Sequence, residues 1–314
     1  MRETHDMSPT AVDVPTPLSV GLVGPGRAGV VVAAALVDAG HAVTGWAGRE
    51  PVSAAGRDRV TGLLAGVPQL THAELVGTSD IVLLGVPDAA VSVVVDAIAG
   101  LPASARAGTA FWHLSGATGV RVLEPLQRSA STGSIPTGAG VLALHPAMTF
   151  TGTAADLPRL TGVTWACTCD ERSSELAHRL VLDLGGHVVD LAEDDRPRYH
   201  AALSHASNFL AVLQAQAADV LRGVGVTDPA AMLGPLVRSA LANALLDPPT
   251  YTGPISRGDI ATIQAHLAAF DESDTRLAYA ALSVATLHRL TAAGALDEVT
   301  SQAVADVLAG PLES

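Results

Sequence analysis

Short apolar runs alternate with helical patterns through the N-terminal part of the chain. The runs predicted as strands cover residues 19–23, 42–46, 81–86, 109–114, 141–144, 163–169 and 187–191. The segments predicted as helices between them cover residues 30–39, 71–75, 89–98, 120–126 and 173–184. Continuous apolar runs such as 81–86 suit parallel strands that are buried on both faces. The alternation predicts a doubly wound, Rossmann-type α/β domain over residues 18–192.

The pattern changes after residue 192, where only helical patterns follow. These helices are predicted at residues 199–222, 229–246, 259–270, 274–293 and 296–308. We therefore expect an all-helical C-terminal domain over residues 193–314. Residues 1–17 hold three prolines and lack the apolar core of a signal peptide, which predicts a disordered tail. Residues 128–140, rich in Ser, Thr and Gly, are predicted as a loop.

The most informative stretch is the glycine turn Gly24-Pro25-Gly26-Arg27-Ala28-Gly29, which joins the first strand to the first helix. In a dinucleotide-binding turn, Gly24 would allow the tight bend, Gly26 would let the backbone approach a pyrophosphate, and Gly29 would let the helix pack closely. The helix N-terminus would then face the phosphates. We predict a dinucleotide site. The alternative is a structural turn in a fold that binds no nucleotide.

The end of the second strand indicates which dinucleotide is bound. An NAD site places an Asp or Glu there for the ribose 2′-hydroxyl, but the residues are Trp46, Ala47, Gly48 and Arg49. Arg49 is instead suited to pair with a 2′-phosphate, and Arg27 is a possible second cation. The alternative for Arg49 is an ordinary solvated loop charge. We therefore predict NADP(H) as the cofactor, with Val86 and Pro87, at the end of the third strand, on the nicotinamide side.

Composition narrows the classes of function. The net charge of -13 and the pI of about 5.1 argue against nucleic acid or an anionic membrane as the main partner. The apolar runs are too short to span a bilayer, which led us to expect a cytoplasmic protein. All 18 basic residues counted as Lys and Arg are arginines, so Schiff-base chemistry and a lysine general acid are excluded.

The two cysteines, Cys167 and Cys169, fall two residues apart in a predicted strand and so would share one face. A disulfide between them is geometrically unfavourable in an extended strand. A metal site needs more ligands than this pair, and we expect ordinary packing of small apolar side chains and no metal.

Candidate catalytic residues occur in the helix predicted at 199–222. His200, Ser204 and Asn208 are spaced four residues apart and share one face of that helix. The helix is apolar or small nearly all round, which predicts burial, and buried polar groups need partners. A substrate is one such partner; hydrogen bonds within a domain interface are the other.

Three further candidates come from loops. His145 follows a predicted strand at the edge of the sheet where ligands bind, so its imidazole is a candidate proton donor, or else a hydrogen-bonded turn residue. Ser115 has a similar position and is a candidate for orienting nicotinamide or substrate. Arg257, just before a helix whose predicted cap is Asp259, is suited to a substrate carboxylate. Alternatively, Arg257 and Asp259 pair with each other to stabilise the loop or a dimer contact.

These motifs together resemble a bacterial family of proposed NADP oxidoreductases that join a Rossmann-like domain to a helical domain of unassigned function. The motifs are the glycine turn at 24–29, Val86-Pro87-Asp88, Leu114-Ser115-Gly116, His145-Pro146, residues 199–208 and Gly253-Pro254-Ile255-Ser256-Arg257-Gly258-Asp259. More distantly, the architecture is similar to pyrroline-5-carboxylate reductase, 6-phosphogluconate dehydrogenase and ketopantoate reductase. The resemblance implies NADP binding and a homodimer formed through the helical domain.

The chain departs from the hydroxyacid dehydrogenases at one position. They carry a catalytic lysine one helical turn before an asparagine, and here the residue before Asn208 at that spacing is Ser204. We predict an NADPH-dependent reductase of a small carbonyl or imine acid, with ketopantoate among the candidates. Asn208 would orient the substrate, His145 or His200 would supply the proton, and Arg257 would hold a carboxylate. The alternatives are an NADP(H) sensor without turnover and a flavin or deazaflavin oxidoreductase.

Overall fold

The computed structural model describes residues 16–128, 140–270 and 273–313. The predicted tail at 1–17, apart from residues 16 and 17, and the predicted loop at 128–140, apart from its two end residues, lie outside this described part. The chain forms two compact units, Met1–Ser204 and His205–Ser314. The sequence places its domain boundary earlier, between residues 192 and 193.

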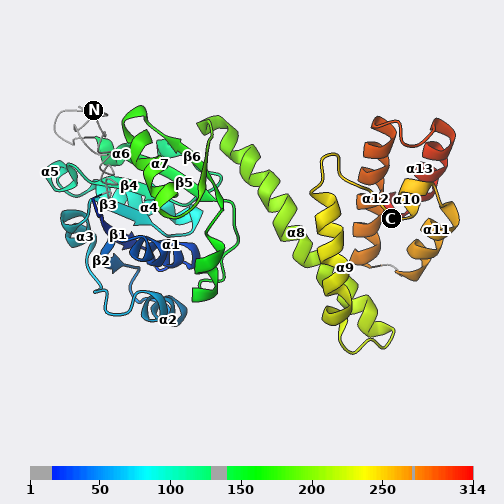
Figure 1. Cartoon of the computed structure of the whole chain (residues 1–314), viewed down its shortest axis with the longest axis horizontal. Helices are drawn as coiled ribbons and strands as arrows, with labels where there is room; N and C mark the ends of the chain where they lie inside the picture. The colour runs from blue at the N-terminus through cyan, green and yellow to red at the C-terminus, as the bar shows by residue number, and fades with distance from the viewer. Residues whose placement is uncertain (1–15, 129–139, 271–272, 314) are drawn as a thin grey trace, which may run out of the picture. The chain divides into compact units, whose positions relative to one another are not determined.

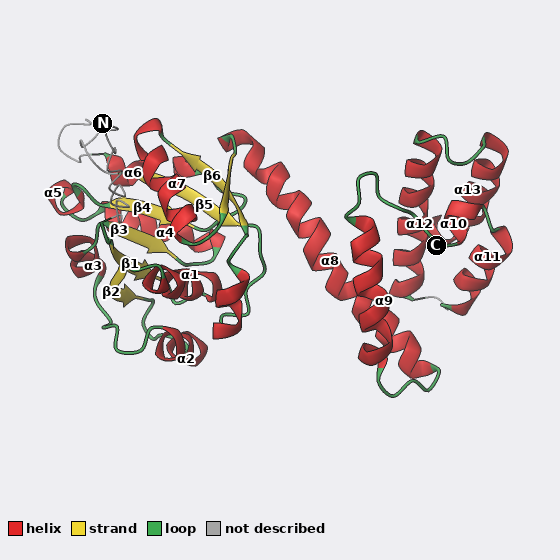
Figure 2. Ribbon diagram, viewed as in Figure 1, coloured by secondary structure: helices red, strands yellow, loops and turns green. Residues whose placement is uncertain are grey.

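The first unit is built on one seven-stranded sheet with helices on both sides (Figures 1 and 2). Its strands are β1 (Ser19–Val23), β2 (Ala42–Ala47), β3 (Ile81–Leu84), β4 (Ala110–His113), β5 (Val141–Pro146), β6 (Thr164–Cys169) and β7 (His187–Asp190). They lie in the order β2-β1-β3-β4-β5-β6-β7. Neighbouring strands are parallel except for β5 and β6, which are antiparallel. The predicted doubly wound α/β fold is confirmed.

Two apolar cores cover the two faces of this sheet, because successive strand residues point to opposite sides. On one face, Leu22, Leu83 and Trp112 pack with helices α1 (Arg27–Asp38) and α7 (Ser174–Asp183). On the other face, Val82 and Phe111 pack with the remaining helices and turns. The elements there are α3 (His72–Thr78), α4 (Asp88–Ala99), η1 (Val120–Leu123) and α6 (Glu124–Gln127).

The helical part begins with α8 (Arg196–Gly223), which runs from the first unit into the second. The other helices are α9 (Pro229–Ala244), α10 (Pro254–Arg257), α11 (Ile260–Ala269), α12 (Asp274–Ala292) and α13 (Glu298–Glu313). Ile263, Leu287 and Val304 are central to the apolar core of this unit. No strand is present among its described residues, as predicted.

Some short elements were not predicted. Helix α2 (Ala54–Leu63) forms in a stretch read as polar; Ser53 caps it by accepting a hydrogen bond from the Gly56 amide. Helix α5 (Ala103–Arg106) and helix α10 were likewise missed. Helix α8 starts before the predicted residue 199, because Pro197 is tolerated in a first helical turn. Among the described residues, no helix combines the length and apolar character needed to cross a bilayer.

Candidate functional site

The glycine turn lies where the chain changes direction across the sheet. From β1 the chain goes to β2 on one side and then crosses to β3 on the other, which opens a crevice at the carboxyl ends of β1 and β3. Gly24 there has a φ of +89°, a conformation that favours glycine. A Cβ atom on Gly26 would lie 2.2 Å from the carbonyl oxygen of Gly85, and one on Gly29 would lie 2.6 Å from the Gly85 Cα. Gly85, which the sequence analysis did not single out, therefore completes the turn.

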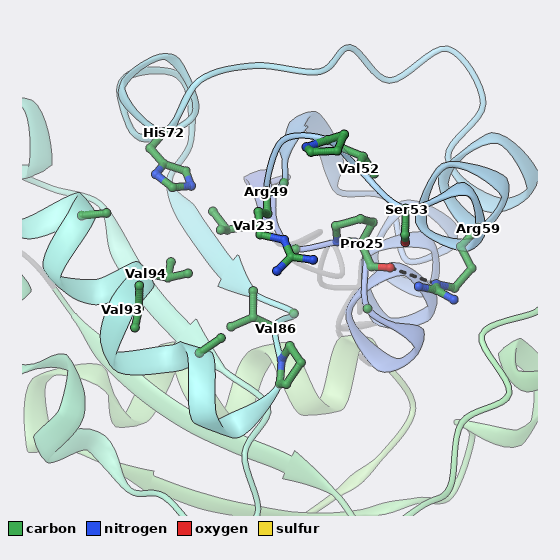
Figure 3. A pocket seen from close by; sticks show the side chains of 18 residues that line it. Val23, Pro25, Arg49, Val52, Ser53, Arg59, His72, Val86, Val93 and Val94 are labelled. Carbon is green, nitrogen blue, oxygen red and sulfur yellow. Dashed lines mark hydrogen bonds between the residues drawn. The ribbon is translucent and has the colours of Figure 1, made fainter.

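A cleft of about 620 Å³ opens beside this turn (Figure 3). Its walls come from the turn, the loop after β2, the start of α3, the end of β3 and helix α4. The lining residues predicted as cofactor ligands are Gly24, Pro25, Gly26, Arg49, Val86 and Pro87. The predicted ligands Arg27, Ala28 and Gly29 belong to the first turn of α1 and do not line the cleft.

The N-terminus of α1 fits an anionic group. Its N-cap residue is Gly26, which has no side chain, and no side chain of the described residues caps this end. Its first turn also carries no acidic residue. The free N–H groups and the helix dipole favour a phosphate at this position.

Cationic and polar side chains line the outer part of the cleft. The guanidinium of Arg49, an exposed residue, points into the cleft in Figure 3. The Nε of Arg59 donates a hydrogen bond of 2.9 Å to the carbonyl oxygen of Pro25, which fixes Arg59 against the glycine turn. His72, on the opposite wall, is half-buried, and this burial lowers the pKa of its imidazole. The sequence predicted a helix around His72, and no signal indicated that this residue faces the cleft.

A second set of polar residues lies at the ends of β4 and β5. His113 is fully buried; its Nε2 donates a 2.9 Å hydrogen bond to the Gly119 carbonyl oxygen, and its Nδ1 accepts one of 3.2 Å from the Ser115 amide. Burial lowers the pKa of His113 to about 4, so the imidazole is neutral at pH 7. The Ser115 hydroxyl accepts a 3.0 Å hydrogen bond from the Thr118 amide and thereby stabilises the turn.

His145, Tyr199 and His200 form an aromatic cluster. The Nδ1 of His145 lies 2.9 Å from the Tyr199 hydroxyl oxygen. The rings of His145 and His200 pack edge to face, with their centroids 5.8 Å apart. Burial, together with the neighbouring His200, lowers the pKa of His145 to about 4, and burial raises the pKa of Tyr199. The Nδ1 of His200 is buried and has no hydrogen-bond partner among the described residues, and its Nε2 lies 3.5 Å from the Ser204 hydroxyl.

Gly116 leaves room beside both imidazoles. A Cβ atom on Gly116 would lie 2.4 Å from the His200 Nδ1 and 2.9 Å from the His145 Nε2. Two imidazole nitrogens therefore converge on this backbone position. Within the first unit, three of the predicted site elements therefore lie together: His145, His200 and the turn that follows Ser115.

Arg196 holds the start of α8 against the sheet, and the sequence analysis missed it. Its side chain is fully buried. Its guanidinium N–H groups donate to the Thr168 hydroxyl at 2.7 Å and to the carbonyl oxygens of Ser115 at 2.8 Å, Thr118 at 3.1 Å, Ala166 at 3.2 Å and Ala143. The preceding Glu193 accepts hydrogen bonds from the amides of Val120 and Arg121. These contacts fix the helix that carries Tyr199 and His200.

The remaining candidates belong to the helical unit. Asn208 is exposed on α8, and its side-chain oxygen accepts a hydrogen bond from the Ser207 hydroxyl. Arg257 is exposed at the end of α10. Asp259 caps α11, as predicted, by accepting hydrogen bonds from the amide and hydroxyl of Thr262. The expected burial of the helix at 199–222 is wrong for the single chain: across α8, all of it described, only Arg196 is buried. Four of its large apolar side chains, those of Phe209, Leu210, Val212 and Val220, are exposed.

Two models of protein families match separate parts of the chain. A model of a Rossmann-like domain matches residues 5–146, and a model of a domain of unknown function, DUF2520, matches residues 163–286. No curated protein matches the chain.

Solved structures share the fold at low sequence identity. A proposed NADP oxidoreductase from Bacteroides fragilis, BF3122, is 19% identical with a TM-score of 0.68; the match covers 85% of this chain and 96% of that one. A reductive aminase from Aspergillus terreus, in complex with NADPH and ethyl levulinate, is 19% identical with a TM-score of 0.59, covering 92% and 99%. A 1-pyrroline-5-carboxylate reductase from Streptococcus pyogenes is 16% identical with a TM-score of 0.53, covering 95% and 99%. Residues 5–146 are thus similar to Rossmann-like domains and residues 163–286 to the DUF2520 domain.

Proposed function

We propose that this protein is an NADPH-dependent oxidoreductase that reduces a small carbonyl or imine substrate bearing a carboxylate. The observation that carries the proposal is the cleft beside Gly24 and Gly26. It combines an uncapped helix N-terminus with a guanidinium, that of Arg49, at the position where an NAD site has a carboxylate. The fold shared with a reductive aminase that binds NADPH supports it.

The residues present suit the parts of NADP(H). The first turn of α1 would hold the pyrophosphate, and Arg49 would pair with the 2′-phosphate through its planar set of donors. The apolar wall of Val93, Val94 and Ala97, together with His72, would take the adenine. When bound, the cofactor supplies the hydride for the reduction.

The cluster of His145, Tyr199 and His200 would supply the proton that the reduced substrate takes up. With a pKa of about 4, His145 is neutral at pH 7, and with a raised pKa, Tyr199 keeps its phenolic proton. The proton that can pass to a substrate oxygen or nitrogen is therefore that of the Tyr199 phenol, and the neutral His145 beside it orients this hydroxyl. The unpartnered Nδ1 of His200 is a second group that can bind the substrate or donate to it.

The finer assignments extend the same proposal. Asn208 would orient the substrate, Ser115 would position nicotinamide or substrate, and Arg257 would bind the carboxylate; ketopantoate is one substrate of this class. A homodimer formed through the helical unit would cover apolar side chains of α8 and α9, such as Phe209 and Leu236, that are exposed in the single chain. We expect the protein to act in the cytoplasm.

The first test is a titration of the purified protein with NADPH and with NADH. We expect NADPH to bind at least about tenfold more tightly, which is about 1.4 kcal/mol. Arg49→Ala should remove most of that preference by weakening NADPH alone. The matched control is Arg289→Ala, an exposed arginine of α12, which should change neither affinity. If neither nucleotide binds, the proposal fails.

The second test is a screen for NADPH oxidation with small keto acids, including ketopantoate, and cyclic imine acids. Turnover that falls strongly in His145→Ala and His200→Ala would support their role in proton transfer. Tight NADPH binding without turnover of any substrate would instead favour a sensor of NADP(H), a reading that the absence of lysine from the chain supports.

A further inference from the structure

Four side chains with metal-binding chemistry gather at the β6–β7 edge of the sheet, away from the glycine turn. Cys167 and Cys169 lie on β6, Asp190 on β7 and His178 on α7. Cys167 and Asp190 are paired in register, so they stand side by side on one face of the sheet. Helix α7 packs over that face, which places His178 above them.

The distances among three of these side chains, Cys167, His178 and Asp190, are compatible with ligands of one ion, and Cys169 adjoins the three through Cys167. A sulfur of Cys167, a nitrogen of His178 and an oxygen of Asp190 all lie within 4.8 Å of one another. The Nε2 of His178 is 3.1 Å from Oδ1 of Asp190, and the sulfurs of Cys167 and Cys169 are 3.8 Å apart. With Zn–S bonds of about 2.3 Å, two thiolates on a tetrahedral zinc ion are separated by about 3.8 Å.

We propose that Cys167, Cys169, His178 and Asp190 form a tetrahedral zinc site. Two sulfurs, one imidazole and one carboxylate are ligands typical of zinc, and thiolates disfavour magnesium and calcium. Cys167 is buried, whereas the side chains of His178 and Asp190 are 39% and 73% exposed. An ion can therefore enter from solvent and be held on its inner side by sulfur.

Two simpler explanations of this cluster, a disulfide bond and ordinary packing, account for fewer of its contacts. A disulfide needs sulfurs about 2.05 Å apart, and the 3.8 Å separation lies across two residues of an extended strand. Ordinary packing accounts for buried Cys167, and a hydrogen bond joins His178 to Asp190, but neither requires that both groups lie within 4.8 Å of the Cys167 sulfur. In the sequence only the two cysteines stand close together, because His178 and Asp190 join them only through the packing of α7 and the register of β7.

The site would be structural. It would tie β6, α7 and β7 together at the edge of the sheet, where β6 runs antiparallel to β5. Between the two cysteines, Thr168 points to the opposite face and accepts the hydrogen bond from Arg196. Zinc would therefore stiffen the strand that anchors α8, without touching the nucleotide cleft.

The test uses the full chain, stripped of metal with a chelator and titrated with Co²⁺. We expect one equivalent to give the visible bands of tetrahedral cobalt and a thiolate charge-transfer band, both abolished by added Zn²⁺. Cys167→Ser should remove the charge-transfer band or reduce it strongly, and Cys169→Ser should reduce it by about half. Zn²⁺ should also raise the melting temperature of the wild type.

A surface variant guards against misfolding of the cysteine variants. His178→Gln should weaken Zn²⁺ binding at least about tenfold, since even outer partners of metal ligands are worth that much. The matched control is His187→Gln, an exposed histidine of β7, which should bind Zn²⁺ like the wild type. Absence of a tetrahedral cobalt spectrum, or an affinity unchanged by His178→Gln, would overturn the proposal. Because no nucleotide is present, the result is independent of the cofactor tests.

Discussion

At the scale of single residues, Arg196 is the most tightly held polar side chain of the first unit. Its guanidinium is fully buried and contacts no carboxylate among the described residues, and backbone oxygens of β5, of β6 and of the turn after β4 accept most of its N–H groups. Burying a guanidinium is costly, and hydrogen bonds to every donor offset that cost. The start of α8 is thus positioned by one side chain.

Replacing Arg196 by methionine should lower the free energy of unfolding by at least about 3 kcal/mol, because several buried carbonyl oxygens lose their donor. Urea denaturation measures the change. Arg198→Met, at an exposed neighbour on the same helix, is the control and should stay within about 0.5 kcal/mol of the wild type. Equal stability of the two variants would show that the buried guanidinium contributes nothing.

His113 and the half-buried His145 make stability depend on pH. The pKa of each is lowered from 6.5 in the unfolded chain to about 4 in the folded one. The unfolded state therefore binds more protons below pH 6.5, and stability falls as the pH drops toward 4. Between pH 7 and 5.5 the loss should be about 1 kcal/mol for each histidine. Urea denaturation at the two pH values tests this, and His113→Gln should remove about half of the difference.

At the scale of elements, β1, α1 and β3 approach one another closely, and glycines in direct contact with each other make this close approach possible. A Cβ atom on Gly85 would lie 2.8 Å from both the Gly24 carbonyl oxygen and the Gly29 Cα. Both are backbone atoms, so the elements themselves must move apart.

We expect Gly85→Ala to cost about 1–3 kcal/mol of stability, the usual range for overpacking, and to weaken NADPH binding. Thermal denaturation and the nucleotide titration measure the two effects. Gly77→Ala in α3 is the matched control, since a Cβ atom there meets nothing within 4 Å. It should be neutral or stabilise the protein, because alanine favours helix. A Gly85→Ala protein as stable as Gly77→Ala would contradict the close contact.

The elements also show what sequence patterns can and cannot predict. The strands were predictable because they are short and mostly apolar, β3 being a continuous apolar run, and the turn at Gly24 because glycine has a specific task there. Helix α2 escaped because it is polar and held by its Ser53 cap. Arg196 and His72 escaped because their roles depend on strands and loops far away in sequence. The same is true of the pairing of Cys167 with Asp190 across two strands.

At the scale of the whole molecule, large apolar side chains are left uncovered on α8 and α9. Leu236 is 63% exposed and Leu245, just after α9, is 77% exposed. Within α9, all of which is described, only Pro229 is buried. Uncovered apolar surface of this kind marks an interface.

We therefore expect the protein to sediment as a dimer and Leu236→Arg to weaken association at least about tenfold, because a charge would be buried at the interface. Sedimentation equilibrium measures the change. Leu182→Arg, at a 66% exposed leucine on α7, is the matched control and should leave the dimer intact. A wild-type monomer at all concentrations would refute the prediction.

The antiparallel pairing of β5 with β6 limits where two genes could recombine to give a chain with this fold. The two family models meet between residues 146 and 163, which is between these paired strands. An exchange there would separate Leu144 from Cys167 and leave two apolar strand edges without partners. A crossover after β7, beyond Asp190, would leave all seven strands of the sheet together. The unit that can be inherited intact is therefore the whole sheet, although sequence similarity divides it in two.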